Sequence, residues 1–275
     1  MLCSNHTMVM SLSAGAPPRH TPHTMNHELL KAAATGDKAL LEQVLGLSSD
    51  NGGKLEAGFG RRCLKGVTSE GNTALHTAAG RGYMELVRIM CDVDPSLIRA
   101  RNNLRNTPLI CAARAGHVDV VCYLIERDLA AAAGSSEAGA APGNDEDSML
   151  RARNSEGATA MHEAIRNGHE AVLEKLVSAG GGLAAVVDGK GFSPLYLAAA
   201  LGRADMVAVL IGGSPPEDGV KSPAYYAGPH GQTALHAAVL VSEGTSSLCF
   251  ASYFCYIWFL IYVSHATQLA ECFKK

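Results

Sequence analysis

Apolar and polar positions along this chain follow the period of short amphipathic helices, and the helices come in pairs. Apolar residues at Val118, Val121 and Leu124 recur with the spacing of one helix face, while Asp119 falls on the opposite face. A shorter helix precedes each such stretch, and its Leu and paired Ala side chains allow close approach of a neighbouring helix. Because two short helices cannot bury their apolar faces alone, the pattern predicts a one-dimensional stack of helix pairs.

The pattern repeats along the chain. Five stretches share a Thr or Ser followed by a short helix: "GNTALHTAAGRGYMELVRIM", "RNTPLICAARAGHVDVVCYL", "GATAMHEAIRNGHEAVLEKL", "GFSPLYLAAALGRADMVAVL" and "GQTALHAAVL". Their anchor residues, at spacings of 34, 52, 34 and 40, are Thr73, Thr107, Thr159, Ser193 and Thr233. The upstream stretch "HELLKAAATGDKALLEQVLG" aligns through Gly36 and forms a sixth, degenerate copy. The base period of 33 or 34 residues with insertions predicts a repeat protein.

Each unit carries the signals that begin and end its first helix. Thr or Ser caps the helix by accepting hydrogen bonds from free backbone N–H groups. Pro108 and Pro194 follow the cap, where no backbone donor is needed. A glycine such as Gly82 or Gly116 ends the helix, because glycine adopts left-handed backbone angles at little cost.

This motif resembles ankyrin repeats, on "TALH" at Thr73, "TPL" at Thr107, "TAMH" at Thr159, "SPLY" at Ser193 and "TALH" at Thr233. The resemblance implies an all-α ankyrin-repeat solenoid of paired antiparallel helices with β-turn and loop connections, used to bind other proteins without catalysis. The stretches "LLKAAATGD", "RNTPLICAARAGHVDVV", "RNSEGATAMHEAIRNGH", "VDGKGFSPLYLAA" and "GPHGQTALHAAV" are similar to plant ankyrin-transmembrane proteins of the accelerated cell death type. That similarity implies a role in plant defence and cell-death signalling.

The boundaries follow from the repeats. We expect a disordered tail over 1–25, a repeat domain over 26–241, a mobile insertion over 130–148 and an apolar, atypical tail over 242–275. The expected units lie near 26–47, 72–101, 106–129, 158–187, 192–212 and, incomplete, 232–241. Because the second helix of the last unit does not follow Val241, the chain reads as a C-terminally truncated relative of that group.

The net charge and the cysteine pattern limit the classes of partner and the cellular compartment that we expect. The net charge of −3, from 23 Lys and Arg against 26 Asp and Glu, gives no global attraction to nucleic acid, so we expect no nucleic-acid partner. The eight cysteines form no C-x-x-C pair, which suits a reducing compartment. We therefore expect a location in the cytoplasm or on the cytoplasmic face of a membrane.

Three local motifs resemble known metal or phosphate sites, but each lacks part of the pattern that the site requires. "HEAIR" at His162 has Arg166 where the zinc-protease motif needs its second His, and a guanidinium cannot ligate zinc. "VDGKGF" at Val187 lacks the glycine spacing of a phosphate loop, and "NDEDS" at Asn144 lacks the Gly and Glu of a calcium loop. We expect no catalytic residue, metal or cofactor, and an enzyme is retained only as a third alternative.

The remaining candidate is a partner-binding surface on the turns and on the ends of the first helices. Three arginines at those helix ends predict a basic row suited to an acidic or phosphorylated partner; alternatively they are solvated and keep the stack soluble. The predicted groove residues are Arg81, Asn103, Leu104, Asn106, Arg114, Ser155, Glu156, Arg166, Lys190 and Phe192.

The C-terminal tail leaves three interpretations open. Residues 245–266 carry no formal charge, and at about 1.5 Å per residue they are long enough as a helix to span a bilayer. However, Trp258 and Tyr256 fall in the middle, whereas spanning helices place such residues at the interfaces. The tail is therefore a membrane attachment, an atypical sequence that arises by alternative splicing, or a packed cap on the last repeat.

Overall fold

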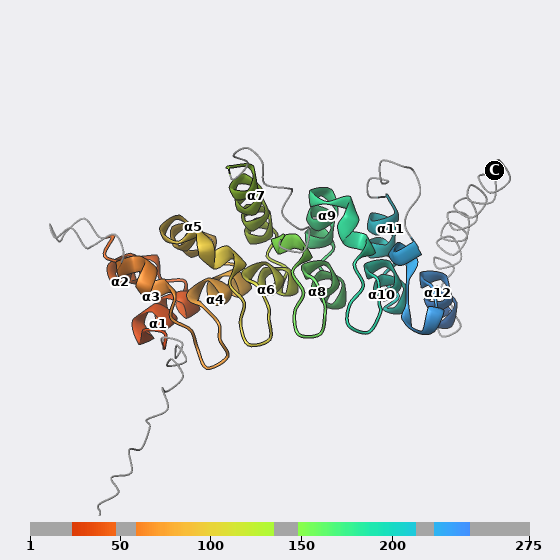
Figure 1. Cartoon of the computed structure of the whole chain (residues 1–275), viewed down its shortest axis with the longest axis horizontal. Helices are drawn as coiled ribbons and strands as arrows, with labels where there is room; N and C mark the ends of the chain where they lie inside the picture. Colours follow the sequence, from red (N-terminus) through yellow and green to blue (C-terminus); the bar gives the residue numbers. More distant parts are fainter. Residues whose placement is uncertain (1–23, 48–58, 135–147, 213–222, 243–275) are drawn as a thin grey trace, which may run out of the picture.

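In the computed structural model, the chain forms an elongated stack of helix pairs (Figure 1). The structure describes residues 24–47, 59–134, 148–212 and 223–242. Within these ranges the elements are helical, and extended pairing is limited to isolated bridges such as Ala227 with Thr233. The predicted all-α solenoid is confirmed.

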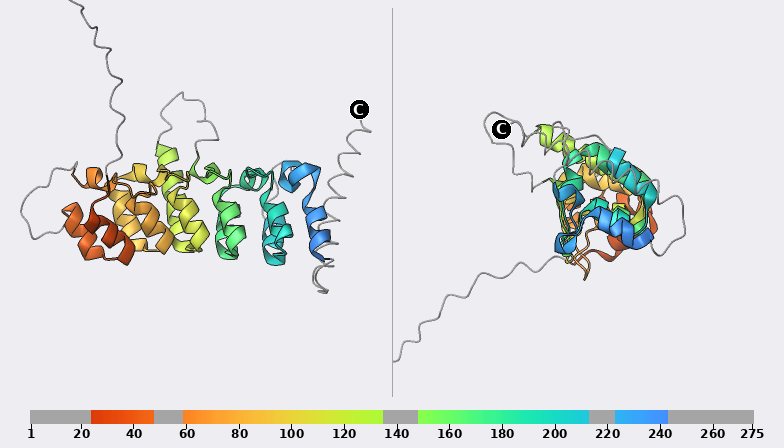
Figure 2. Two further views of the ribbon diagram at one scale, coloured as in Figure 1. Left: turned by 90° about the horizontal axis from the view of Figure 1, so that it is seen from below. Right: turned by 90° about the vertical axis from the view of Figure 1, so that its right-hand side faces the viewer.

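Two rows of helices run along the stack. The row that carries the cap motifs, called here the inner row, comprises α1 (His27–Thr35), α4 (Ala74–Arg81), α6 (Pro108–Ala115), α8 (Ala160–Asn167), α10 (Pro194–Ala200) and α12 (Ala234–Ser242). The outer row comprises α2 (Lys38–Leu45), α5 (Met84–Val93), α7 (Val118–Gly134), α9 (Glu170–Ala179) and α11 (Ala204–Gly212). Short 3₁₀ turns connect the pairs: η1 (Pro95–Arg99), η3 (Met149–Arg151), η4 (Gly181–Ala185), η5 (Pro223–Tyr226) and η6 (Pro229–Gly231). The two rows and the long loops below the inner row are visible in Figures 1 and 2.

The predicted caps begin the inner helices. Thr107 Oγ1 accepts a hydrogen bond from the N–H of Ile110 at 3.3 Å, and Ser193 Oγ accepts one from the N–H of Tyr196 at 3.1 Å. Since these contacts satisfy donors that the first turn leaves free, the sequence motif sets where each inner helix starts.

The helix-ending glycines have a second role that the sequence did not suggest. Gly116 has φ of 83°, and a Cβ at this position would lie 2.5 Å from Nδ1 of His169 in the next unit. The same His169 ring places Nε2 3.0 Å from the carbonyl oxygen of Arg114. Gly116 therefore ends one helix and leaves room for a side chain of the following unit, and Gly82 does the same for His117. The bond of His169 to the preceding unit ties the two units together.

The core between the rows consists of small and branched apolar residues. Paired alanines of the inner row, Ala32 with Ala33 and Ala78 with Ala79, are fully buried, and so is Leu124 of the outer row. Ala side chains let adjacent inner helices pack closely, so burial in the stack is continuous from unit to unit.

The structure adds helices where the sequence predicted only loops. The helix α3 (Phe59–Leu64) lies in the first inter-repeat insertion and packs against α2 and α5, with Leu64 fully buried. The helix α7 continues to Gly134, so its last residues enter the stretch assigned to the second insertion. Of the predicted tails 1–25 and 242–275, residues 1–23 and 243–275 lie outside the described residues, and so does the uncharged segment 245–266. In the described part of the chain, none of the helices has the length and apolar character needed to cross a membrane.

Candidate functional site

Five loops of equal design project from one edge of the inner row; we call them fingers 1 to 5. They span residues 68–72, 102–106, 154–158, 188–192 and 228–232. In each finger the N–H of the first residue donates to the carbonyl oxygen of the last residue. The N···O distances in fingers 1 to 5 are 3.0, 3.1, 2.9, 2.9 and 2.9 Å. The repeat therefore builds one compact turn immediately before the cap of each inner helix from α4 onward.

In fingers 1 to 4 the side chain of the first residue holds the finger closed. Asn102, Asn154 and Asp188 each accept, through Oδ1, a hydrogen bond of 2.9 Å from the N–H four residues later. Thr68 does the same through Oγ1 at 3.2 Å. Side chains that bond their own backbone in this way are typical of tight turns, and they make the finger rigid.

The fingers are tied to one another at their tips. The N–H of Asn103 donates to the carbonyl oxygen of Glu70 at 3.1 Å, and the N–H of Ser155 donates to that of Leu104 at 2.8 Å. The N–H of Gly189 donates to the carbonyl oxygen of Glu156 at 2.8 Å. Fingers 1 to 4 therefore form one continuous edge rather than four independent loops.

Most predicted finger residues lie on this edge with their side chains in solvent. Asn103, Leu104, Ser155, Glu156 and Lys190 are exposed, and Leu104 retains 58% of its accessible surface. Their exposure leaves them available to a partner.

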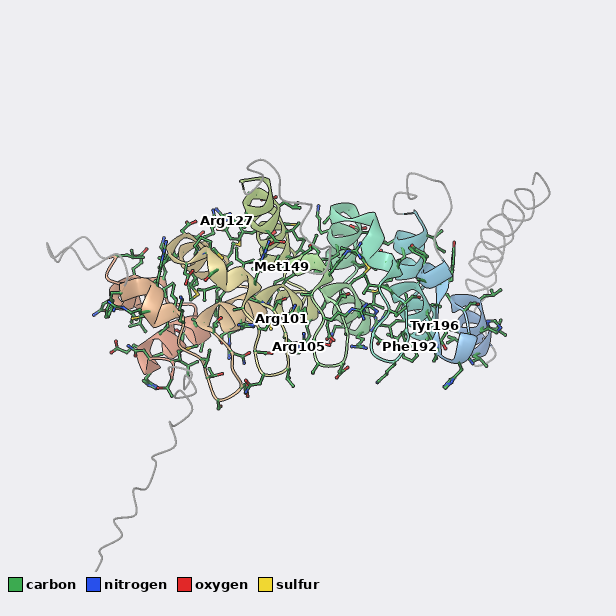
Figure 3. The ribbon with its side chains drawn as sticks, in the orientation of Figure 1. Arg101, Arg105, Arg127, Met149, Phe192 and Tyr196 are labelled. Atoms are coloured by element: carbon green, nitrogen blue, oxygen red, sulfur yellow. The ribbon has the colours of Figure 1, made fainter. Side chains whose placement is uncertain are left out.

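Two of the predicted finger residues have internal contacts instead. Asn106 is buried, and its carbonyl oxygen lies 2.9 Å from Nε2 of His76. Phe192 is half-buried and stacks on Tyr196, with ring centroids 5.2 Å apart (Figure 3). Asn106 therefore shapes finger 2, whereas Phe192 offers only part of its ring.

The structure separates the three arginines of the predicted basic row. Arg114 and Arg166 lie two residues before their helix-ending glycines, but Arg81 lies directly before Gly82, about 100° further around the helix. Arg81 is exposed, and in the described ranges its guanidinium has no ion-pair partner. Arg81 therefore does not continue the line of the other two.

Arg114 and Arg166 meet at one buried carboxylate. Glu163 Oε2 lies 2.8 Å from Nε of Arg114, and Glu163 Oε1 lies 2.9 Å from Nη1 of Arg166. Arg166 also places Nη2 2.8 Å from Oδ2 of Asp188, whose side chain is fully buried. Burial alone would lower the pKa of Arg114, but its hydrogen bond and ion pair with Glu163 outweigh burial and raise it. We call Arg114, Glu163, Arg166 and Asp188 the ionic cluster.

Glu163 and Asp188 are functional residues that the sequence pattern did not indicate. Glu163 lies three residues before Arg166, a spacing at which helix side chains meet, and this was the signal for half of the cluster. The other two ion pairs, Arg114 with Glu163 and Arg166 with Asp188, join α6 to α8 and α8 to finger 4. These elements come together only in the folded stack. The charge of the two arginines is therefore largely neutralised within the protein.

The motif histidines are structural. Nδ1 of His162 lies 2.9 Å from the hydroxyl of Thr159, and Nε2 lies 2.9 Å from the carbonyl oxygen of Phe192. His76 makes the matching contacts with Thr73 and Asn106. Burial lowers the pKa of both imidazoles, which keeps them neutral as each links a helix cap to the next finger.

Other chemistry-bearing groups in the described ranges are held in unreactive settings. Burial raises the pKa of Cys91 to about 12 and that of Cys111 to about 11, so neither thiol is a ready nucleophile. No cluster of three or more His, Cys, Asp or Glu there is placed to hold a metal ion. A small cavity between η1 and α7 contains Arg99 and Asp128, which pair with each other at 2.8 Å.

Two known proteins are similar to this chain. A Caenorhabditis elegans protein named poly [ADP-ribose] polymerase tankyrase is 26% identical over 135 residues, which cover 47% of this chain and 5% of that protein. The Arabidopsis thaliana protein named ACCELERATED CELL DEATH 6, a distant homologue, is 28% identical over 182 residues, which cover 65% of this chain and 24% of that protein. The chain thus spans a quarter or less of the length of these relatives.

A family model described as "Ankyrin repeats (3 copies)" matches residues 29–135 and 140–219, which together make up more than half of the chain. The match contains the cap motifs at Thr73, Thr107, Thr159 and Ser193, on which the resemblance was based, and the structure shows those motifs in repeated helix pairs. This chain belongs to the ankyrin repeat family.

Proposed function

We propose that this chain recognises a partner protein through its fingers and the adjoining faces of the inner helices, and that it does so in plant defence and cell-death signalling. Ankyrin repeats imply a protein-protein interaction module. The observation that carries the proposal for this chain is the bonded edge of fingers 1 to 4, which holds exposed side chains in fixed positions. A preformed surface loses little conformational entropy when it binds.

The chemistry of this edge favours a partner with an acidic or phosphorylated surface. Lys190 and Arg81 are exposed cations on finger 4 and at the end of α4. Arg114 and Arg166 retain 41% and 24% of their side-chain surface, but their charge is largely neutralised within the ionic cluster. The preference for an acidic partner therefore rests on Lys190 and Arg81. Asn103 and Ser155 add uncharged hydrogen-bonding groups between these positions.

The proposed pathway rests on the Arabidopsis thaliana relative, whose name refers to cell death. The similarity extends over most of this chain but over only 24% of that relative, so it concerns the recognition module and not the whole protein. In this proposal the chain acts without catalysis, in the cytoplasm or on the cytoplasmic face of a membrane.

Membrane association through residues 245–266 is the alternative, and the uncharged sequence of that segment is the observation that favours it. Alkaline carbonate extraction of the full chain and of a chain ending at Val241 tests it. If the segment is an anchor, only the full chain stays with the membrane pellet. Equal extraction of both chains excludes the anchor.

Affinity capture from plant extract tests the recognition surface. The bait is the full chain, and the test variant combines Leu104→Asp with Lys190→Glu on the fingers. The matched control combines Glu174→Lys with Lys175→Glu, two exposed positions on the outer helix α9. We expect the finger variant to lose partners that the control retains. Identical captured proteins for both variants would contradict the proposal.

A further inference from the structure

We propose that finger 2 is the anchor of the recognition surface, and that its Leu104–Arg105 pair binds an extended acidic segment of a partner protein with an apolar residue next to its carboxylates. The inference rests on the proposed function and names the partner's chemistry.

The backbone of finger 2 departs from that of the other fingers at one residue. The fourth finger position has positive φ throughout, and in four fingers it is a glycine: Gly71, Gly157, Gly191 and Gly231. In finger 2 it is Arg105, with φ of 58°. An L-residue with a large side chain is disfavoured in this region, so finger 2 retains an arginine against local conformational preference.

No contact in the described structure explains why an arginine stands there. Arg105 is exposed, and among the described residues its guanidinium has neither a hydrogen-bond nor an ion-pair partner. Its neighbour Leu104 exposes 58% of its surface, although its carbonyl oxygen is held by finger 3. A strained residue whose side chain does nothing for the fold is a candidate for function.

Two further exposed arginines lie on the approaches to fingers 2 and 3. Arg101, on the approach to finger 2, is exposed and donates through Nη1 to the carbonyl oxygen of Arg153 at 3.3 Å, and Arg153 is itself exposed (Figure 3). In the described ranges neither forms an ion pair with a carboxylate. Finger 2 contains no acidic residue, whereas its neighbours carry the exposed Glu70 and Glu156. Positive charge is therefore concentrated at finger 2 itself, and charge complementarity favours a carboxylate there.

The rigidity of finger 2 suits an anchor. Besides the Leu104 contact with finger 3, Asn103 holds finger 1 through its N–H to Glu70 and through Nδ2 to the carbonyl oxygen of Ser69 at 3.0 Å. The backbone of finger 2 is thus fixed on both sides, so Leu104 and Arg105 project from defined positions. An extended segment with an apolar residue beside acidic ones matches that pair.

Selection from a display library of random 16-residue peptides, with the full chain as bait, tests the proposal. We expect enrichment of peptides with Asp or Glu beside Leu, Ile or Phe. The affinity of a selected peptide, measured by fluorescence anisotropy, should fall roughly tenfold or more in Arg105→Gly and in Leu104→Ser, since a charge-assisted contact or an apolar anchor is lost. It should weaken as salt is raised.

The variants keep folding and binding apart. Arg105→Gly removes the strained residue, so its melting temperature should not fall while its binding is lost. Arg105→Lys retains the charge and should bind better than Arg105→Gly. Lys175→Ala, on the outer helix α9, removes one exposed positive charge far from the fingers in sequence and is the matched control.

The outcomes separate this proposal from the proposed function. If acidic peptides are not enriched, or if Arg105→Gly and Leu104→Ser bind as the wild type does, finger 2 is not the anchor. Partner capture that is lost in the Leu104→Asp and Lys190→Glu variant would still support the module. Anionic vesicles or an RNA oligonucleotide that displace the selected peptide from the wild-type chain would show general anion binding and overturn the peptide proposal.

Discussion

Replacement of Glu163 by Ala should destabilise the stack more than any change at a finger tip. Glu163 is 5% exposed, and its carboxylate oxygens lie 2.8 Å and 2.9 Å from two guanidiniums. Removal of one partner from a buried ion pair typically costs about 3–5 kcal/mol, because a charge remains buried without compensation. Here Arg114 is 41% exposed and can regain water, and Arg166 keeps Asp188. We therefore expect a loss of about 2–3 kcal/mol of unfolding free energy.

Urea unfolding followed by circular dichroism measures this loss. Glu156→Ala is the matched control, since Glu156 also faces Arg166, at 3.5 Å, but retains 62% of its side-chain surface. Exposed pairs of this kind contribute about 0–1 kcal/mol. A double-mutant cycle of Glu163→Ala with Arg114→Ala should give a coupling energy of at least about 1 kcal/mol between the two. A Glu163→Ala loss no greater than that of Glu156→Ala would refute the reasoning.

Three shorter predictions concern the backbone and the histidines. Arg105→Gly should raise the unfolding free energy by about 0.5–1 kcal/mol because it removes a left-handed arginine, and a decrease in urea unfolding would contradict this. Gly116→Ala should lower the unfolding free energy more than Gly231→Ala does, because only at Gly116 would the new Cβ meet a side chain of the next unit. Gly231 has no neighbour within 4 Å, so Gly231→Ala bears only the strain of positive φ, about 1 kcal/mol. Equal losses would exclude the contact with the next unit. Because burial lowers the pKa of His76 and His162 below 6.5, stability should be full above that pH and fall below it, by up to about 1.4 kcal/mol per pH unit for each histidine; equal unfolding midpoints at pH 7.5 and pH 5.5 would contradict this.

The helices of each unit could be predicted because their signals are local. The cap at Thr107, the proline after it and the glycine at Gly116 act within one helix, so one repeat contains all the information. The helix α3 has no such signal. It depends on docking: Leu64 is buried against its neighbours, and Arg61 donates to the carbonyl oxygen of Val93 at 3.0 Å. That contact joins residues distant in sequence, so no local sequence pattern predicts α3.

The candidate site could be predicted only in part. The exposed finger positions followed from the family pattern. The predicted basic row did not consider that Arg81 lies one position further along its helix than Arg114 and Arg166, or that Glu163 pairs with the other two arginines. The hydrogen bonds between finger tips use backbone groups, such as the carbonyl of Leu104, so they cannot be predicted from the side chains in the sequence. Arg105, in contrast, was visible: alignment of "SEGN", "NLRN", "SEGA", "GKGF" and "PHGQ" places it where the other fingers have glycine.

The ionic cluster and the finger edge join the same units, so binding and stability should be coupled. The cluster links α6 and α8 to finger 4 through Asp188, and the tip bonds link finger 2 to finger 3 through Leu104. A ligand that binds only the folded edge stabilises it by RT ln(1 + [L]/Kd), which is about 2.7 kcal/mol at a concentration of 100 Kd. That is close to the loss expected for Glu163→Ala. A peptide that binds finger 2 should therefore restore most of the unfolding midpoint of Glu163→Ala but not that of Glu163→Ala combined with Arg105→Gly.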